Sequence, residues 1–592
     1  MQTLDYIVLL IYLAGIFLVG VIFSFRNKSE EDLFTAGGQS PWWAAGLSSF
    51  MTMFSAGTFV VWGGIAYRLG LVAVAINLCY GVAALGVGYF VAGRWKQIGV
   101  ATPAEYVRLR FGEAAVHFYT WAMTVFGIVG VGVAFYSLGV ILVTMMPLAE
   151  GNPFRDPATG NLSLLWAVLL FGGVVVLYTM IGGLWAVLMT DVLQFIVLNL
   201  AVLFVIPLLL LRVGGMGDFL AQAPEDFFTP TSARYSWLFL AGWTAIHFFK
   251  VGAGWAFAQR FICVSSPRAA RRSSYLFGIL YLVSPLLWLL PPLLWRIEQP
   301  IPADASEADI VALAEQAYIQ SCSAVLPAGM VGLLVAAMFS ATASMASSQL
   351  NVFAGVLTHD MYRPLVGARA TRRHLLWAGR LLTLALGVVL LGVSLLVPRL
   401  GGAERVVIAV ASLVSVPLMA PTLIGLFSPR LDARAVWYTA AVCGTLGILV
   451  KFGLNADGWL AGVQSLAGLR QWIEVNSSNV DILLGVVLPL LILGLLHFSR
   501  SDTSRGWLRV QDAVPPPPPT DGPVAAVSKT PALTVAAAIG GCGLLMAVLA
   551  AVNQQGRAAL IIFAAALFVL AAVILALTLR LARVVEPVPT GR

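Results

Sequence analysis

The sequence predicts an all-α integral membrane protein with about 15 transmembrane helices. Of its 592 residues, 60% are apolar and only 10% are charged. The mean hydropathy is +0.91, and apolar stretches of about 20 residues recur along the chain. Because a soluble domain carries about 25% charged residues, this chain has too few polar groups to cover a water-facing surface. The composition therefore excludes a soluble enzyme and a nucleic-acid-binding protein.

Each predicted span is an apolar stretch long enough to cross the hydrocarbon core. In order along the chain, the predicted spans cover residues 4–24, 41–67, 72–96, 117–146, 163–183, 185–212, 236–262, 268–296, 325–362, 372–397, 403–427, 433–453, 479–498, 533–552 and 558–583. We also expect a short helix near Ile310–Gln320, in the loop of residues 297–325.

The flanking charges predict the orientation. Asp5 precedes the first span, and Arg26 and Lys28 follow it, which is the reverse of a signal peptide. With the N-terminus outside, most basic residues fall on inside loops, as the positive-inside rule requires. The basic clusters are Arg94, Lys96, Arg108 and Arg110; Arg260, Arg268, Arg271 and Arg272; and Arg363, Arg369, Arg372 and Arg373. We therefore expect a multi-pass cell-membrane protein with a cytoplasmic C-terminus.

Glycines interrupt two of the predicted spans. The second contains Ser55-Ala56-Gly57 and Gly63-Gly64, and the seventh contains Gly252-Ala253-Gly254. Broken helices are tolerated in a membrane where they line a cavity. Two of them five spans apart, threading the membrane in opposite directions, are typical of the binding site in transporters built from inverted repeats. The alternative is that the glycines only allow helices to pack closely.

Ionisable residues within spans are costly unless they are paired or hydrated. Lys250 lies near the middle of the seventh span, and His247 is three residues earlier on the same helical face. Both could donate to a polar or anionic solute, or Lys250 could pair with a carbonyl freed by the break, or with Asp191. Asp191 lies near the inner end of its span, where it could bind a cation or serve a structural role.

The ninth span carries a stripe of small and hydroxylated residues. Ala341, Ser344, Met345 and Ser348 share one helical face. Hydroxyl and carbonyl oxygens suit Na⁺, because a hard cation prefers oxygen ligands. Taken alone, the stripe favours a helix-packing seam over a cation site.

Several segments resemble the sodium:solute symporter family, which includes sodium-coupled sugar, proline, sialic acid, iodide and monocarboxylate carriers. The matching segments are Phe34-Thr35-Ala36-Gly37-Gly38, residues 41–48, Gly182 to Gln194, Gln259-Arg260, and the serine-rich ninth span ending in Asp360-Met361-Tyr362. The resemblance implies a LeuT-like core of two inverted five-helix repeats, with one helix before it and about four after it.

The expected organisation follows from that core. Residues 1–40 form an N-terminal helix and an inside loop, and residues 41–427 form the core, with repeats at about 41–212 and 236–427. Residues 428–498 add further transmembrane helices. Residues 499–531, with Pro515 to Pro519, form a stiff extended cytoplasmic linker, and residues 532–592 contain two appended helices and a short tail.

The resemblance also implies two sodium sites. In the first, carbonyls of Met51, Phe54 and Ala341 and the hydroxyl of Ser344 would bind Na⁺. The next ligand, normally a hydroxyl, falls on Met345, whose soft thioether is a poor ligand for Na⁺. The second site, nearer the inside, would comprise Asp191, Ser344, Ser347 and Ser348.

The implied solute contacts are Met53, Thr58, Asn77, Tyr80, Gly254 and Trp255, beside which His247 and Lys250 favour a small polar or anionic solute. We therefore expect a secondary active transporter that imports such a solute with a cation, Na⁺ first, and needs no cofactor. A proton-coupled or uncoupled carrier and a transporter-like sensor are the alternatives. An enzyme is not expected, since the spans lack metalloprotease or serine-hydrolase motifs and paired carboxylates.

Overall fold

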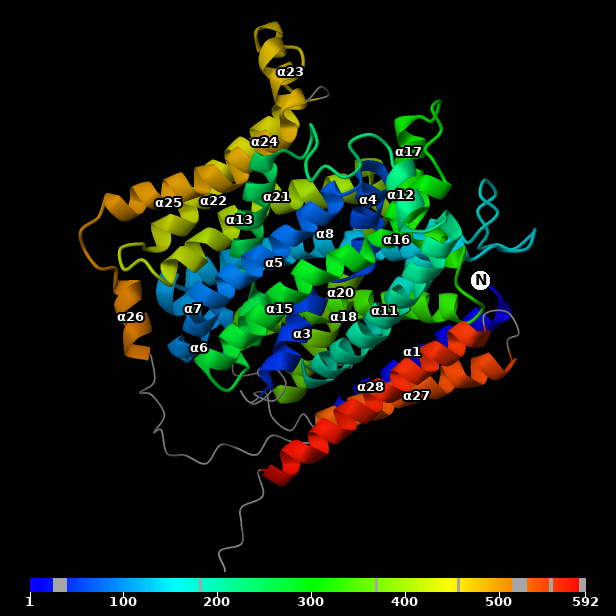
Figure 1. Ribbon diagram of the computed structural model, residues 1–592. Helices are drawn as coiled ribbons and strands as arrows, with labels where there is room; N and C mark the ends of the chain where they lie inside the picture. Colours follow the sequence, from blue (N-terminus) through cyan, green and yellow to red (C-terminus); the bar gives the residue numbers. More distant parts are fainter. Residues whose placement is uncertain are drawn as a thin grey trace, which may run out of the picture.

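The computed structural model describes residues 1–24, 40–179, 184–367, 371–454, 458–513, 530–552 and 557–584. Within these ranges the protein is helical apart from turns, loops and three isolated β-bridges, which confirms the all-α prediction (Figure 1). Outside them lie Arg26, Lys28, the segment Phe34 to Gly38, Gly182, Arg369 and the proline run Pro515 to Pro519.

The helices up to the end of the first predicted repeat have these bounds: α1 Thr3–Ser24, α3 Trp42–Thr52, η2 Thr58–Trp62, α4 Gly63–Leu69, α5 Val72–Phe90, α6 Ala92–Ile98, α7 Pro103–Phe111, α8 Glu113–Met145, α9 Leu164–Ala167, η3 Val168–Gly172, α10 Gly173–Thr179 and α11 Leu184–Val213.

The next helices, up to the end of the predicted core, are α12 Met216–Gln222, α13 Trp237–Ala253, α14 Trp255–Ile262, α15 Pro267–Trp288, α16 Leu290–Glu298, α17 Glu307–Ser323, α18 Met330–Val356, η4 Leu357–Tyr362, α19 Arg363–Val366, α20 Arg372–Leu396, η6 Val397–Leu400 and α21 Gly402–Gly425.

The remaining helices are α22 Ala433–Ile448, η7 Leu449–Gly453, η8 Gln464–Leu466, α23 Ala467–Val475, α24 Ser477–Ile482, η9 Leu483–Val487, α25 Leu488–Phe498, α26 Arg505–Ala513, α27 Thr530–Val552 and α28 Arg557–Val584.

Nine helical segments in the described ranges are long and apolar enough to cross a membrane. They are 72–90, 113–145, 191–213, 267–298, 330–356, 377–400, 402–425, 433–451 and 477–498. The structure therefore supports a multi-pass membrane protein. The higher predicted number of spans and the inverted repeat stay predictions, and helix interruption accounts for part of the difference, because a broken span is divided into pieces of fewer than 18 residues.

The helix α18 forms the centre of the fold. Its apolar window is 94% buried, and it packs against α1, α3, α8, α11 and α20. Small residues such as Ala336, Ala337 and Ala346 are fully buried along it, and small side chains allow helices to approach closely.

Asp5 joins the first helix to the start of α18. One carboxylate oxygen accepts hydrogen bonds from the backbone N–H groups of Gly329 (2.6 Å) and Gly332 (3.0 Å). The side chain is buried, and it satisfies amides that a helix N-terminus leaves unpaired. Asp5 therefore has a structural role as well as its place in the charge pattern.

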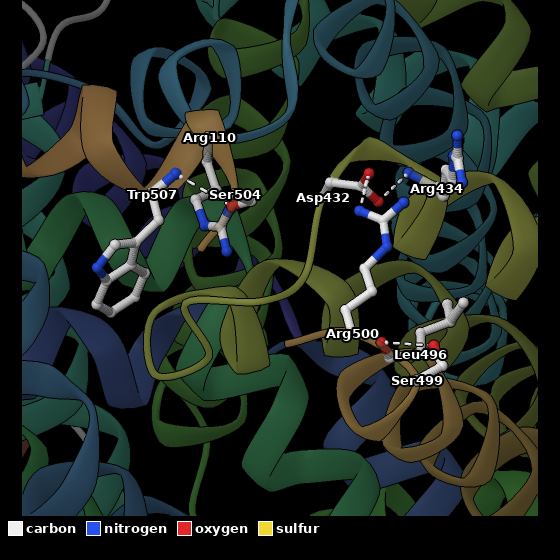
Figure 2. A network of polar contacts seen from close by, with 8 residues as sticks. All are labelled: Arg110, Asp432, Arg434, Leu496, Ser499, Arg500, Ser504 and Trp507. Carbon is white, nitrogen blue, oxygen red and sulfur yellow. Dashed lines mark hydrogen bonds and ion pairs between the residues drawn. The ribbon is translucent and has the colours of Figure 1, made fainter. Parts of the chain in front are cut away.

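The segment after α25 differs from the extended linker expected over residues 499–531, because residues 505–513 form the helix α26. Arg110 at the end of α7 donates to the hydroxyl of Ser504 (2.8 Å) and the carbonyl of Ser428 (2.7 Å), and it lies over the ring of Trp507. Figure 2 shows Arg110, Ser504 and Trp507 beside the Arg500–Asp432 ion pair. Docking against a folded surface thus overrides the extended conformation.

The last two helices lie outside the central bundle. Figure 1 shows α27 and α28 as an antiparallel pair beside α1. They pack against each other, α1 and α11, and an array of apolar side chains on them, such as Ile562 and Val569, is exposed. Such an arrangement suits helices that face lipid.

Candidate functional site

The first glycine-rich span is broken where the sequence predicts. The helix α3 ends at Thr52, and regular helix resumes only after Ser55, with a π-helical turn from Thr58 to Trp62. Hydroxyl groups accept hydrogen bonds from the freed backbone amides: Ala56 N–H donates to Thr342 Oγ1 (2.9 Å), Gly57 N–H to Ser55 Oγ (3.2 Å) and Ser55 N–H to Thr58 Oγ1 (3.3 Å). The break is therefore held against α18.

The second predicted break is also present. The helix α13 ends at Ala253, Gly254 is extended (φ −62°, ψ 131°), and α14 starts at Trp255. The carbonyl of Gly252 accepts a hydrogen bond from the buried indole of Trp95 (2.7 Å), and the carbonyl of Gly254 accepts the N–H of Ala258 (2.9 Å). A side-chain carbon at Gly254 would lie 2.4 Å from the carbonyl oxygen of Lys250, so this turn requires glycine.

Both breaks line the same cavity, which has a volume of about 240 Å³. Gly57 and Thr58 from the first break and Gly254 and Trp255 from the second form part of its wall. The other wall residues that the sequence analysis selected are Met53, Tyr80, Lys250 and Met345. The cavity has the size of a small organic molecule, and interrupted backbone meets it from two sides.

Two polar groups in this wall are available to a solute. No carboxylate lies within 4.0 Å of Lys250 in the described part of the chain. The indole N–H of Trp255 is buried without a hydrogen-bond partner among the described residues. A buried donor without a partner is costly. A cation and an unpaired donor in one wall favour an acceptor-rich solute.

Two predicted solute contacts are not in the cavity wall. His247 lies behind Tyr80, with ring centroids 3.7 Å apart, and its Nδ1 is 2.9 Å from the carbonyl oxygen of Trp243. The amide of Asn77 donates to the carbonyl of Ala73 one turn earlier (2.9 Å). Both side chains are buried. In this conformation they support the wall rather than form it.

Asp191 is at the centre of a buried polar network. Its carboxylate accepts hydrogen bonds from the hydroxyls of Ser48 (2.6 Å) and Ser344. The guanidinium of Arg260 donates to the same Ser48 hydroxyl (2.9 Å) and to the carbonyl of Ala256 (2.7 Å). Asp191, Arg260 and Ser48 are each 1% exposed or less.

This network joins four helices: α3 and α14, which carry the two breaks, and α11 and α18. Of the other residues predicted for the inner sodium site, Ser347 donates to the carbonyl of Ser344 (3.0 Å), and Ser348 follows it, half-buried. Asp191 is thus close to one predicted partner, Ser344. It contacts Ser48 and Ser344, and through Ser48 it is linked to Arg260 rather than to Lys250, the partner that the sequence left open.

The residues of the predicted first sodium site occupy both sides of the α3–α18 contact. Met51 lies in the last turn of α3 and Phe54 in the first break, and Ala341, Ser344 and Met345 lie on α18. The Ala56–Thr342 hydrogen bond joins the two elements at this level. Met345 faces the cavity, so a thioether stands where a hydroxyl would serve Na⁺ better.

Sequence reasoning did not assign a site role to Ser48, Arg260, Thr342 or Trp95. It counted Arg260 and Arg110 among the basic loop residues, but both are buried, at 1% exposure. Their roles depend on contacts between distant segments, which a single sequence does not display. Arg260 offered one signal, because it follows the second break within the same predicted span.

Comparison with known proteins gives a consistent result. The family model described as "Sodium:solute symporter family" matches residues 33–442. The sodium/sialic acid symporter NanT of Aliivibrio fischeri is 27% identical over 403 residues, covering 65% of this chain and 75% of that protein. The sodium/glucose cotransporter of Vibrio parahaemolyticus is 25% identical over 484 residues, covering 76% of this chain and 86% of that protein.

A solved structure shares the fold. It is that of a Na⁺-coupled sialic acid symporter in a substrate-bound outward-open state, with a TM-score of 0.64 and 22% sequence identity. The match covers 85% of this chain and 99% of the other.

Proposed function

The chain belongs to the sodium:solute symporter family, and from this premise we propose that it imports a small anionic or polar organic solute together with Na⁺ by alternating access. The observation that carries the proposal is the common cavity of the two broken helices. Symporters are transporters and not enzymes, and broken helices around a central cavity are how such carriers bind a solute within the membrane.

The wall chemistry supports an anionic solute. Lys250 contributes a cation that no carboxylate of the described residues neutralises, and Trp255 contributes an unpaired N–H donor. A carboxylate on the solute would pair with Lys250 and accept from Trp255. Apolar residues such as Val61, Met123 and Phe126 form much of the remaining wall, so the rest of the solute is small and only moderately polar.

The Asp191 network supports Na⁺ coupling at the inner site. A carboxylate and serine hydroxyls are hard oxygen ligands, and Asp191, Ser344, Ser347 and Ser348 supply them on two adjacent helices. The first site retains its carbonyls but has Met345 in place of a hydroxyl. We therefore assign Na⁺ coupling to the inner site. From the distribution of basic residues among the loops, we also place the N-terminus outside and the C-terminus in the cytoplasm.

The same network gives a mechanism for closure on the inner side. Ser48 lies on the half-helix before the first break, and Arg260 on the half-helix after the second. Hydrogen bonds through Asp191 hold both against α11 and α18. Release of the solute inward requires these half-helices to separate. Na⁺ bound to Asp191 would compete with the serine hydroxyls for the carboxylate and so link ion occupancy to this movement.

A thermal-shift screen tests the proposal. The purified protein is heated with members of a library of monocarboxylates, sugars, amino acids and neutral amides, in NaCl or in choline chloride. A ligand of the folded form raises Tm. We expect a carboxylate to raise Tm in NaCl more than in choline chloride, and Lys250→Met to abolish that shift without lowering the ligand-free Tm. A neutral solute that stabilises native protein and Lys250→Met equally would refute the anionic class.

A further inference from the structure

A second carboxylate network lies at the other end of the broken helices. Glu404, near the start of α21, forms an ion pair with Arg68, at the end of α4. Its other carboxylate oxygen accepts a hydrogen bond from the hydroxyl of Tyr235 (2.6 Å) and lies 3.7 Å from Arg234. Arg68 and Glu404 are largely buried, with side chains 18% and 17% exposed.

The partners of Glu404 belong to both broken helices. Arg68 lies on α4, the half-helix that follows the first break. Tyr235 lies two residues before the start of α13, the half-helix that comes before the second break. One carboxylate on α21 therefore contacts the far ends of both half-helices. Asp191 contacts the opposite half-helices, through Ser48 and Arg260.

A second buried carboxylate fixes the start of α21. Glu315 on α17 accepts hydrogen bonds from the backbone N–H of Ala403 (3.1 Å) and from the hydroxyl of Tyr136 on α8 (2.6 Å). Glu315 therefore fixes the start of α21, and with it Glu404, relative to α8 and α17. Arg68 and Tyr235 attach the two half-helices to this fixed carboxylate.

These contacts lie in the wall of a second cavity, which shares a wall residue with the solute cavity. Arg68, Glu315 and Glu404 line a larger cavity of about 1020 Å³. Val61 lines both this cavity and the smaller one. The helix α21 also faces both, through Ile408 in the larger cavity and Val406 in the smaller. Val61, Val406 and Ile408 thus form an apolar layer between the two cavities. Val61 lies on η2, which continues into α4, and the other two lie on α21. Glu404 joins α4 to α21 through its ion pair with Arg68.

We propose that Glu404 is a positioning residue of the outer gate: its contacts with Arg68 and Tyr235 hold both half-helices against α21, and they break when the passage to the larger cavity opens. The inference rests on the proposed transport function. Opening requires the layer at Val61 to separate, and α4 cannot move away from α21 while the Arg68–Glu404 ion pair persists.

Labelling of single introduced cysteines tests the gate without requiring transport. Val61→Cys reports on the layer between the cavities, where Val61 is 3% exposed. Gln349→Cys, on the later half of α18 in the wall of the smaller cavity, reports on the opposite side. Each is placed in protein in nanodiscs and treated with a soluble maleimide. The native protein with its own cysteines gives the background rate.

We expect Glu404→Gln to raise the labelling rate of Val61→Cys several-fold and to lower that of Gln349→Cys, because an equilibrium shifted toward the outward-open state exposes one and closes the other. A general loss of packing would raise both rates. Arg405→Gln is the matched control, since Arg405 is the next residue, lines the same cavity and forms no ion pair in the described part of the chain. It should leave both rates unchanged.

Tyr235→Phe provides a second variant that removes a single hydroxyl and keeps the carboxylate. It should shift both rates in the same directions as Glu404→Gln, by a smaller factor, and Glu404→Asp should restore part of the native pattern. Unchanged rates in Glu404→Gln and Tyr235→Phe, or a parallel rise at both reporters, would overturn the proposal. Opposite shifts in a protein that accumulates no solute would retain the gate and refute the transport function instead.

Discussion

Replacing Asp191 by asparagine is the sharpest perturbation of the inner site. The amide matches the carboxylate in size, so the change removes one negative charge and little volume. In the native structure the carboxylate accepts from Ser48 and Ser344 and lies beside the buried guanidinium of Arg260. The variant removes the negative charge that acts on that cation.

Asp191→Asn should lower both the stability of the protein and its affinity for Na⁺. The buried carboxylate of Asp191, which is 1% exposed, accepts two hydroxyl hydrogen bonds, and a hydrogen bond to a charged group contributes about 1.5–3 kcal/mol, so the ligand-free Tm should fall by several degrees. For Na⁺, loss of a charged ligand costs about 1.5–3 kcal/mol, which weakens binding roughly 10- to 150-fold.

The assay is Tm as a function of Na⁺ concentration, with choline chloride holding the ionic strength constant. The native protein should gain Tm as Na⁺ rises, and Asp191→Asn should need roughly 10- to 150-fold more Na⁺ for half of the gain. Asp432→Asn is the control, because it makes the same chemical change in an ion pair whose partners are both 33% exposed, where about 0–1 kcal/mol is at stake. An unchanged Na⁺ midpoint in Asp191→Asn would refute the assignment.

Three further predictions test other parts of the structure. Met345→Ser should lower the Na⁺ midpoint several-fold, because a hydroxyl replaces a thioether beside Ser344; a midpoint at or above the native value would contradict this. Burial raises the pKa of Glu315, so its ionised form destabilises the fold at neutral pH, and the Tm of native protein minus that of Glu315→Gln should increase as pH falls from 7.5 to 5; a constant difference would count against it. Gly506→Val should detach α26 and speed proteolysis between residues 499 and 531, because a side-chain carbon at Gly506 would lie 1.9 Å from the carbonyl oxygen of Arg110; native cleavage rates would show that α26 is not held there.

Local sequence signals predicted the two helix breaks. Glycine clusters located both helix breaks, because glycine leaves the backbone free to depart from helix without a side-chain clash. Lys250 and Asp191 stood out as ionisable residues within spans. The apolar helix α27 contains no charged residue, and nothing in its sequence indicated which helices it would contact.

Long-range contacts were beyond the reach of single-sequence reasoning. His247 shares a helix face with Lys250, but the position of Tyr80 on α5 covers it and removes it from the cavity wall. The sequence pattern groups Arg260 with the basic loop residues, whereas in the structure it donates a hydrogen bond to Ser48 of α3. The helix α26 packs against α6 and α7, where Arg110 of α7 donates a hydrogen bond to Ser504 just before α26 begins. In each case the missing information is which distant segment packs there.

Uptake into proteoliposomes tests the central claim most directly. Vesicles containing the native protein are loaded with choline chloride and diluted into NaCl with a labelled carboxylate that raised Tm in the screen. We predict accumulation above the external concentration that collapses when the Na⁺ gradient is dissipated and is lost in Asp191→Asn. Equilibration without accumulation, or accumulation that follows a proton gradient and ignores Na⁺, would contradict the account.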